Sequence, residues 1–282
     1  MSTDPAVDVQ WIEHRGYRHA IHLCETSEGT GDLVLLHGAG VASEATWYPM
    51  LPEFKSFRRI ICPDLRGMGR SHSLDFIDRS VTVDEVVDDV LAILTHYSIN
   101  QCQMVGYSFG GLIALLVNAA RRELVCDMVL LEPALLERAS LGALRAVRAH
   151  YADAAAALLS KDDPSIGVRQ FLDLIAPHRS KHPRVERMTV QRLASRPEGL
   201  AYALMAVNEA AWHIDRMQCI ECAPSTLSLI GSKSIDEAHE FHQILEASRG
   251  NWHYQSVMGV DHALPYQKPG LCARLIVEHL GP

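Results

Sequence analysis

Short apolar runs alternate with longer segments of helical spacing along most of this 282-residue chain. Residues 32–36 and 127–131 are apolar almost throughout, as expected of strands that are buried on both faces of a sheet. Residues 82–97 instead repeat apolar side chains every three or four positions, which predicts an amphipathic helix. The expected strands are 9–12, 17–24, 32–36, 59–62, 104–108, 127–131, 226–230 and 252–257. The expected helices are 82–97, 112–120, 235–248 and 269–280, with a short helix at 47–54 that Pro49 and Pro52 interrupt.

This alternation predicts the α/β fold class, with a mostly parallel sheet that helices cover on both faces. Residues 134–217 do not follow it, because they contain no convincing strand and are rich in Ala, Leu and Arg. Prolines at 164, 177, 183 and 197 divide that segment into shorter pieces. We therefore expect a core domain formed by residues 1–133 and 218–282, with residues 134–217 inserted as a helical layer over the sheet.

The net charge, the apolar runs and the cysteines indicate which binding partners and which location to expect. The net charge of −8 argues against nucleic acid or an anionic membrane as the main partner. We find neither an apolar run long enough to span a membrane nor the basic and apolar segments of a signal peptide, so we expect a cytoplasmic protein. The seven cysteines are scattered, and we interpret them as reduced and mainly buried thiols. Cys219 and Cys222 form one C-x-x-C pair without a second, which is a weak signal for a redox or metal site.

The candidate chemistry begins at Gly106-Tyr107-Ser108-Phe109-Gly110, which lies between a strand-like run and a helical segment. A serine at a strand-to-helix corner between glycines is the pattern of a nucleophile elbow. The turn is so tight that only glycine fits beside it, and it holds the serine in a strained conformation with its hydroxyl exposed. Ser108 would also stand at the positive end of a helix, where developing negative charge is stabilised.

Four motifs occur in the order and spacing typical of one family: LLHGAG at 35–40, DLRGMGRS at 64–71, GYSFGG at 106–111 and GVDH at 259–262. On these motifs the chain resembles the α/β-hydrolase family, from about residue 9 to its C-terminus. The resemblance implies the α/β-hydrolase fold and identifies residues 134–217 with the family's cap domain, which lies over the active site. It also implies that the DLRGMGRS segment has a structural role, in which it holds a loop beneath the site.

A serine hydroxyl needs a base to take its proton, and His262 is the best candidate among 15 histidines. It follows the last expected strand, precedes the final helix and stands last in the order serine, acid, histidine. In the family, the residue matched by His37 is usually a packing residue. His239 and His242 flank Glu240 without the spacing of a zinc site, so we expect a solvated helix face there and no metal.

An oxyanion needs two donors aimed at it. The N–H of Phe109, directly after the nucleophile, is the first candidate. By resemblance, the N–H of Ala39 supplies the second. We expect no cofactor, since the serine, the base and these donors are sufficient for acyl transfer.

The acid is where the sequence departs from the family's pattern. Most serine members carry it as Gly-x-x-Asp after the strand matched here by 226–230. Here Gly231 is followed by Ser-Lys-Ser, so Ser234 stands where aspartate is expected, and a hydroxyl cannot offset the charge of an imidazolium. Asp261 adjoins His262, and because adjacent side chains on a loop usually diverge we rank it low.

Three explanations compete for the missing acid. In the first, Glu132 reaches His262 from the end of the neighbouring strand, a position that serves in some family members such as part of the haloalkane dehalogenase group. In the second, Asp236 or Glu237 serves from a slightly longer loop. In the third there is no acid, and the protein is catalytically weak or does different chemistry. We favour Glu132, because the absence of aspartate at 234 distinguishes it from an ordinary acidic residue before proline.

The nucleophile then selects among reactions. Family members that cleave haloalkanes or epoxides form an ester on aspartate, and position 108 is serine. The leading hypothesis is a serine hydrolase that acts on an ester, thioester, lactone or related acyl substrate of small to medium size through an acyl-enzyme. The alternatives are hydrolysis of a carbon–carbon bond beside a carbonyl, and a non-hydrolytic cyclase, lyase or ligand-binding receptor. We expect a small-molecule substrate and leave the oligomeric state open, with a homodimer among the options.

Overall fold

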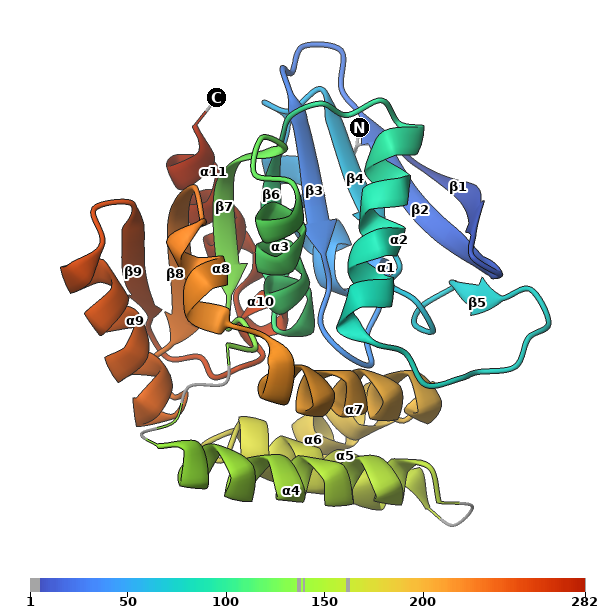
Figure 1. Ribbon diagram of the computed structural model, residues 1–282, viewed down its shortest axis with the longest axis vertical. Helices are drawn as coiled ribbons and strands as arrows, with labels where there is room; N and C mark the ends of the chain where they lie inside the picture. The colour runs from blue at the N-terminus through green and yellow to red at the C-terminus, as the bar shows by residue number, and fades with distance from the viewer. Residues whose placement is uncertain (1–5, 136–137, 139, 161–162, 282) are drawn as a thin grey trace.

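The computed structural model describes residues 6–135, 138, 140–160 and 163–281. Its strands are β1 (Val7–His14), β2 (Tyr17–Glu25), β3 (Asp32–Leu36), β4 (Arg59–Pro63), β5 (His72–Ser73), β6 (Cys102–Tyr107), β7 (Val125–Leu131), β8 (Ser225–Gly231) and β9 (Trp252–Val257). They form one sheet in the order β1-β2-β4-β3-β6-β7-β8-β9, with β5 paired to β2 (Figure 1). From β4 to β9 neighbouring strands are parallel, whereas β2 pairs with β1, β4 and β5 in the antiparallel direction.

The central strands are apolar throughout because both faces of the sheet are covered. In β3, Val34 and Leu36 belong to one hydrophobic cluster, whereas Leu33 and Leu35 belong to another. All four side chains are fully buried. Since successive side chains of a strand point to opposite faces, the continuous apolar run serves two cores at once.

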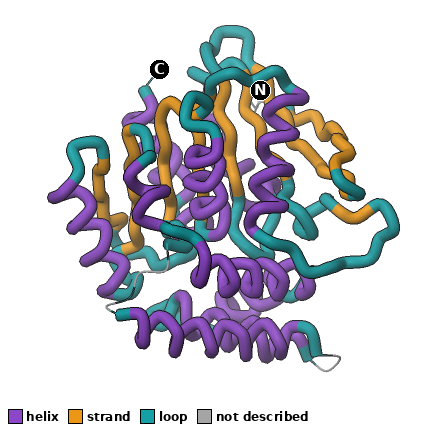
Figure 2. The backbone as a smooth tube through the Cα atoms, in the orientation of Figure 1, coloured by secondary structure: helices purple, strands orange, loops and turns teal. Residues whose placement is uncertain are grey.

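Helices form the two covering layers (Figures 1 and 2). One layer contains α2 (Val83–His96), α3 (Phe109–Ala120), α8 (Arg216–Glu221) and α9 (Asp236–Ser248). The other contains α1 (Ser43–Trp47), the 3₁₀ helix η1 (Tyr48–Glu53), α10 (Leu264–Gln267) and α11 (Pro269–Leu280). The predicted sheet with helices on both faces is therefore present.

The helix predicted at 47–54 has a different form from the one expected. Residues Tyr48–Glu53 adopt a 3₁₀ helix, which follows the short helix α1. Pro49 and Pro52 explain the difference, because proline has no N–H to donate and obstructs a regular α-helix. The result is a compact turn that buries Met50 and Leu51 against the sheet.

A third layer lies beyond the carboxyl ends of the parallel strands. It consists of α4 (Leu141–Leu158), α5 (Pro164–Ile175), α6 (Pro183–Leu193) and α7 (Pro197–His213), which lie side by side in Figure 1. Pro164, Pro183 and Pro197 each open a helix, the position where a missing N–H costs nothing. The layer has its own hydrophobic cluster, which includes Phe171 and Leu193.

The segment between β7 and β8 thus contains this layer and then α8, which packs against α3 in the layer over the sheet. The expected boundary at residue 217 falls inside α8. In the part of the chain that the structure describes, we find no helix that is both long and apolar enough to cross a membrane.

Candidate active site

Ser108 stands at the corner between β6 and α3. Its φ of 52° and ψ of −114° lie in a region that side chains rarely adopt, so its backbone is strained. A Cβ on Gly106 would lie 2.5 Å from the Gly110 carbonyl oxygen, and one on Gly110 would lie 2.2 Å from that of Leu36. The two glycines are therefore needed for strand and helix to approach this closely. The Ser108 N–H donates to the Leu131 carbonyl at 2.9 Å, which ties the corner to β7.

His262 lies beside Ser108, on the loop between β9 and α10. Its Nε2 is 3.1 Å from the Ser108 Oγ, within hydrogen-bond distance. The loop is held close to β8, because a Cβ on Gly231 would lie only 2.7 Å from the carbonyl oxygens of Val260 and Asp261. The structure thus brings together two residues that are 154 positions apart.

Glu132 directly follows β7 and contacts the other nitrogen of the same ring. Its Oε2 lies 3.2 Å from His262 Nδ1. Because a carboxylate can only accept, this contact favours the tautomer with hydrogen on Nδ1, which leaves Nε2 free to accept the Ser108 hydroxyl proton. Like Ser108, Glu132 has a positive φ, of 48°. Both ends of the chain of contacts are therefore held in strained backbone.

Two further donors hold the Glu132 carboxylate. Its Oε1 accepts from the Gly231 N–H at 2.6 Å and from the Ser234 hydroxyl at 2.5 Å. Burial by itself would raise the pKa of Glu132, but the hydrogen bonds from His262, Ser234 and Gly231 hold that pKa below its ordinary value. The carboxylate is thus ionised at neutral pH. The hydroxyl of Ser234 supports the acid, a contact that the sequence analysis missed.

The structure does not bring the other carboxylates to His262. The Asp261 carboxylate accepts from the Ala263 N–H and from Gln267 Nε2, both at 2.9 Å. Asp236 and Glu237 are exposed in the first turn of α9, and among the described residues neither contacts His262. Of the alternatives weighed from the sequence, Glu132 is the one within reach of the ring.

The two expected oxyanion donors line the same cavity as Ser108 and His262. Phe109 is the first residue of α3, so its N–H has no acceptor within the helix. Within the described residues, the N–H groups of Ala39 and Phe109 have no other hydrogen-bond acceptor. Both groups can therefore bind an oxygen atom next to the Ser108 hydroxyl.

The loop that carries Ala39 is fixed from beneath. The ring of His37 donates from Nδ1 to the Gly38 carbonyl at 2.7 Å and accepts from the Leu65 N–H at 2.9 Å. Burial lowers the pKa of His37, which keeps the ring neutral and able to do both. The Asp64 carboxylate in turn accepts from the backbone N–H groups of Ser43 and Arg70, both at 2.8 Å. These contacts fit the structural roles that the family resemblance implied for this region.

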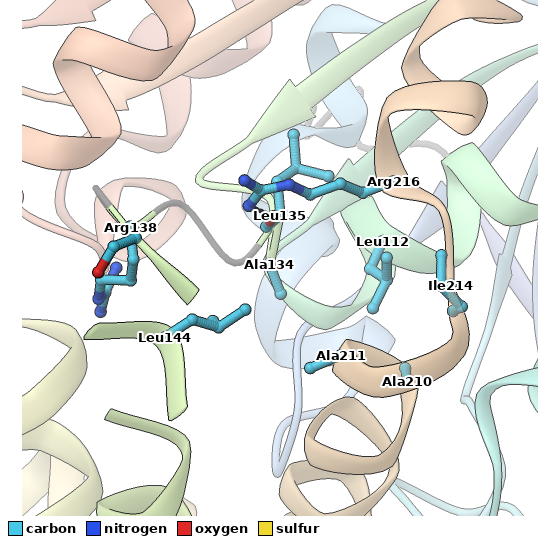
Figure 3. A pocket seen from close by; sticks show the side chains of 10 residues that line it. Leu112, Ala134, Leu135, Arg138, Leu144, Ala210, Ala211, Ile214 and Arg216 are labelled. Carbon is cyan, nitrogen blue, oxygen red and sulfur yellow. Dashed lines mark hydrogen bonds between the residues drawn. The ribbon is translucent and has the colours of Figure 1, made fainter. Parts of the chain in front are cut away.

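Two cavities meet at Ser108. The smaller, of about 70 Å³, is lined by Glu132, Ile230, Ala238 and other residues. The larger, of about 230 Å³, lies against α5 and α6 and is mostly apolar. A third cavity, of about 370 Å³, lies beside them and is lined by Leu112, Ile214 and the residues labelled in Figure 3, but not by Ser108 or His262. A bound acyl compound at Ser108 would therefore extend into the first two.

The structure corrects the expectation for His242 and bears on the one for the cysteines. The solvated helix face expected at 239–242 is wrong for His242, which is buried and stacks on Trp252 at 5.9 Å between ring centroids. The buried side of α9 includes this ring, together with Ala238 and Leu245. All seven cysteines are free thiols, and Cys219 and Cys222 are half-buried.

Comparison with protein families matches most of the chain. The sequence profile of the alpha/beta hydrolase family matches residues 33–275. The chain belongs to this family. The α/β-hydrolase fold predicted from the four motifs is thereby confirmed.

Curated relatives of this alpha/beta hydrolase match it over shorter stretches. Strigolactone esterase D14 of Arabidopsis thaliana is 36% identical over 107 residues, which are 36% of this chain and 39% of that protein. The 2-hydroxymuconate semialdehyde hydrolase of a Pseudomonas species is 37% identical over 101 residues, or 35% of each chain. The chain thus spans less than half the length of these relatives. Their names are those of enzymes of the predicted class.

Solved structures match over nearly the whole length. A hydrolase from Pseudomonas aeruginosa matches with a TM-score of 0.77 at 19% identity, and the match covers 98% of this chain and 99% of that chain. Est816, described as an N-acyl homoserine lactone degrading enzyme, has a TM-score of 0.72 at 20% identity, with 95% and 99% covered. At these identities the likeness concerns the fold alone.

Proposed function

We propose that this protein is a serine hydrolase that cleaves an ester, thioester, lactone or related acyl substrate through an acyl-enzyme on Ser108. The observation that carries the proposal is the continuous chain of contacts from Ser108 Oγ through both His262 nitrogens to Glu132. A nucleophile, a base and a group that orients the base are the three parts that acyl transfer by serine requires.

In the proposed reaction, His262 Nε2 takes the Ser108 proton as Oγ attacks the substrate carbonyl carbon. The carbonyl oxygen gains negative charge and accepts hydrogen bonds from the N–H groups of Ala39 and Phe109. The protonated His262 then gives its proton to the leaving group, and the bond to that group breaks. Water then attacks the acyl carbon as the same ring takes its proton. The bond from that carbon to Ser108 Oγ breaks, the ring returns the proton to Oγ, and the acid product leaves.

Glu132 would act on His262 rather than on the substrate. When the ring carries two protons, it is a cation in a buried site, which is costly unless an opposite charge lies next to it. The ionised carboxylate at 3.2 Å supplies that charge and keeps the ring oriented. Ser234 and Gly231 hold the carboxylate in place, so the acid keeps its function from an unusual strand end.

We further propose that α4 to α7 form a cap that bounds the substrate cavities. Phe171 and Ile175 of α5 line both cavities at Ser108, and Leu193 of α6 lines the larger one. The mostly apolar lining suits a small or medium acyl compound. The cytoplasmic location and the oligomeric state stay predictions from the sequence.

A second candidate reaction is hydrolysis of a carbon–carbon bond beside a carbonyl. The 37% identity with 2-hydroxymuconate semialdehyde hydrolase favours it. The same serine, base and oxyanion donors would serve, with a carbon acid as the leaving group. Cleavage of compounds that carry such a carbon–carbon bond, without activity on esters, would select this candidate.

Labelling with a fluorophosphonate tests the common core of both reactions. We expect intact mass spectrometry to show one adduct per chain, and peptide mapping to locate it on Ser108. We also expect the protein to hydrolyse short 4-nitrophenyl esters. Ser108→Ala should abolish both signals, whereas Ser248→Ala, which removes an exposed hydroxyl on α9, should change neither. Failure of the folded wild type to be labelled at Ser108 would overturn the proposal.

A further inference from the structure

The larger cavity at Ser108 is lined by an arginine that forms no ion pair within the described residues. Arg192, in the last turn of α6, lines this cavity. Its guanidinium lies over the ring of Tyr266, 4.4 Å from the centroid. In the described part of the chain, Arg192 has no ion pair and its guanidinium has no hydrogen bond. A half-buried arginine held only by a ring is free to bind an anion.

The other charged side chains of the cavity are engaged with neighbouring groups. Arg179 lies 2.7 Å from Asp173 and 3.6 Å from Glu186. The Asp261 carboxylate is turned toward its own loop, where it accepts from Ala263 and Gln267. Among the described residues that line the cavity, Arg192 is therefore the charged side chain whose hydrogen-bonding groups are not engaged.

A second polar group in the same cavity lacks an internal partner. Tyr107 lines the cavity and is only 6% exposed. Its hydroxyl has no hydrogen-bond partner among the residues that the structure describes, and its oxygen is not fully buried, so it is open to a molecule bound in the cavity. Burial raises the pKa of Tyr107 well above its usual value, so the phenol keeps its proton and can donate it.

Arg192 and Tyr107 both contact the aromatic ring of Tyr266. Tyr107 packs edge-to-face against Tyr266 with 6.0 Å between centroids, and Arg192 stacks on that same Tyr266. Tyr107 also lies 5.5 Å from the ring of His262. Tyr266 itself is engaged elsewhere, because its hydroxyl is 2.8 Å from the Thr46 hydroxyl. The cavity lining as a whole is mostly apolar, with Phe171 and Leu172 among its members.

We propose that the larger cavity selects acyl substrates that carry a free carboxylate, which Arg192 binds as a cation and Tyr107 as a hydrogen-bond donor. This inference rests on the proposed function, since it names the substrate class of the same site. The carboxylate would be separated from the reacting carbonyl by an aliphatic or aromatic spacer that contacts the apolar wall. A neutral ester of the same size would leave Arg192 without an ion pair and the Tyr107 hydroxyl without a charged acceptor.

Matched pairs of esters test the selection. One pair places the carboxylate on the acyl part, with the 4-nitrophenyl monoester of glutaric acid against 4-nitrophenyl pentanoate. The other places it on the leaving group, with 4-acetoxybenzoate against phenyl acetate. We expect kcat/KM to favour the charged member of at least one pair by about tenfold or more, a preference that declines as salt is raised. An absence of preference in both pairs would overturn the inference.

Variants assign the preference to the two residues. Arg192→Ala should lower kcat/KM for the charged ester about tenfold, mainly through KM, and leave the neutral ester within about threefold. Arg187→Ala removes an equal charge from the exposed side of the same helix and should leave the preference intact. Tyr107→Phe, which keeps the ring, should reduce the preference by a few-fold. A preference that survives Arg192→Ala would contradict the assignment.

The labelling experiment separates this inference from the proposed function. A wild-type protein that is labelled at Ser108 and hydrolyses neutral esters, but shows no preference in either pair, retains the proposed function and loses the carboxylate subsite. A protein that is not labelled at Ser108 loses the proposed function itself. The rate of Ser108 labelling by a neutral fluorophosphonate should be unchanged in Arg192→Ala, which shows that the variant keeps an intact nucleophile.

Discussion

The Ser234 hydroxyl donates a 2.5 Å hydrogen bond to Glu132 Oε1. Ser234 occupies the position where most serine members of the family carry their aspartate, and Glu132 directly follows the adjacent strand, β7. The carboxylate is thus at the end of β7, and its hydrogen-bond donor comes after β8. This arrangement explains how the site can dispense with aspartate at 234 and still present a carboxylate to His262.

Removal of the Glu132 charge should disable the proposed reaction. We expect Glu132→Gln to lower kcat/KM for 4-nitrophenyl esters by about 10²- to 10⁴-fold, as loss of a triad carboxylate does elsewhere. The amide can neither balance the imidazolium charge nor favour the required tautomer. Asp236→Asn is the matched control and should retain wild-type activity, since Asp236 is exposed on α9. The reverse pattern would assign the acid to Asp236.

Ser234 is a positioning residue, because it acts on the substrate only through Glu132 and His262. We expect Ser234→Ala to lower kcat by about tenfold with little change in KM, since a hydrogen bond to a charged group is lost. The pKa of Glu132 should rise when this donor is removed, and titration of that carboxyl followed by NMR should show the rise. Ser234→Thr, which keeps the hydroxyl, should recover most of the activity. An unchanged pKa of Glu132 in Ser234→Ala would contradict this role.

Much of the fold follows from sequence because its causes are local. Each central strand buries both faces, so a run such as Leu33 to Leu36 can be identified without knowledge of its neighbours. The glycines around Ser108 likewise predict the elbow, since no other residue fits there. The 3₁₀ form of Tyr48–Glu53 could have been anticipated from its two prolines.

The parts that sequence analysis missed depend on contacts through space. The Ser234 hydroxyl supports an acid 102 positions away, and nothing in its own neighbourhood indicates this. His242 looks like a surface residue in a polar helix, but packing of α9 on the sheet buries it against Trp252. The division of the space at Ser108 into two cavities is set by side chains of α5 and α6, whose placement no motif encodes.

Asp64 predicts how stability depends on pH. Burial would raise the pKa of this carboxyl, but the hydrogen bonds from His22 and from the Arg70 N–H hold that pKa below the ordinary value of 3.8. Its contribution to stability is therefore complete above about pH 3.8 and is lost as the pH falls toward the lowered pKa. We expect the free energy of unfolding, measured in urea, to decrease as the pH is lowered through this range.

The same experiment on Asp64→Asn isolates this contribution. At pH 7 the variant should be about 3 kcal/mol less stable, because a buried group that accepts from several donors loses its charge. Its stability should also decline less steeply between pH 4 and pH 2 than that of the wild type. Asp163→Asn, at the exposed start of α5, is the control and should change stability little, since asparagine also caps a helix. Parallel pH profiles of wild type and Asp64→Asn would contradict the prediction.

Phe171 should determine which chain lengths the site accepts. This α5 side chain lines both cavities that meet at Ser108, so its ring forms part of the wall between them. Phe171→Ala should join the two spaces and shift the optimum of 4-nitrophenyl ester hydrolysis toward longer acyl chains. The preference for longer chains should increase because short substrates lose their contacts with the Phe171 ring, which should lower their kcat/KM by about tenfold.

The variant will also be less stable, by about 3 kcal/mol, because Phe171 is 7% exposed and belongs to the cluster of the helical layer. Ile166→Ala removes an apolar side chain that is 51% exposed on the same helix and should alter neither stability nor the chain-length profile. The ratio of kcat/KM for octanoate to butyrate esters at 15 °C, where both variants stay folded, is the measurement that decides. A ratio that stays at the wild-type value would mean that the two cavities do not share Phe171 as a functional wall, and that substrate length is set by α6 instead.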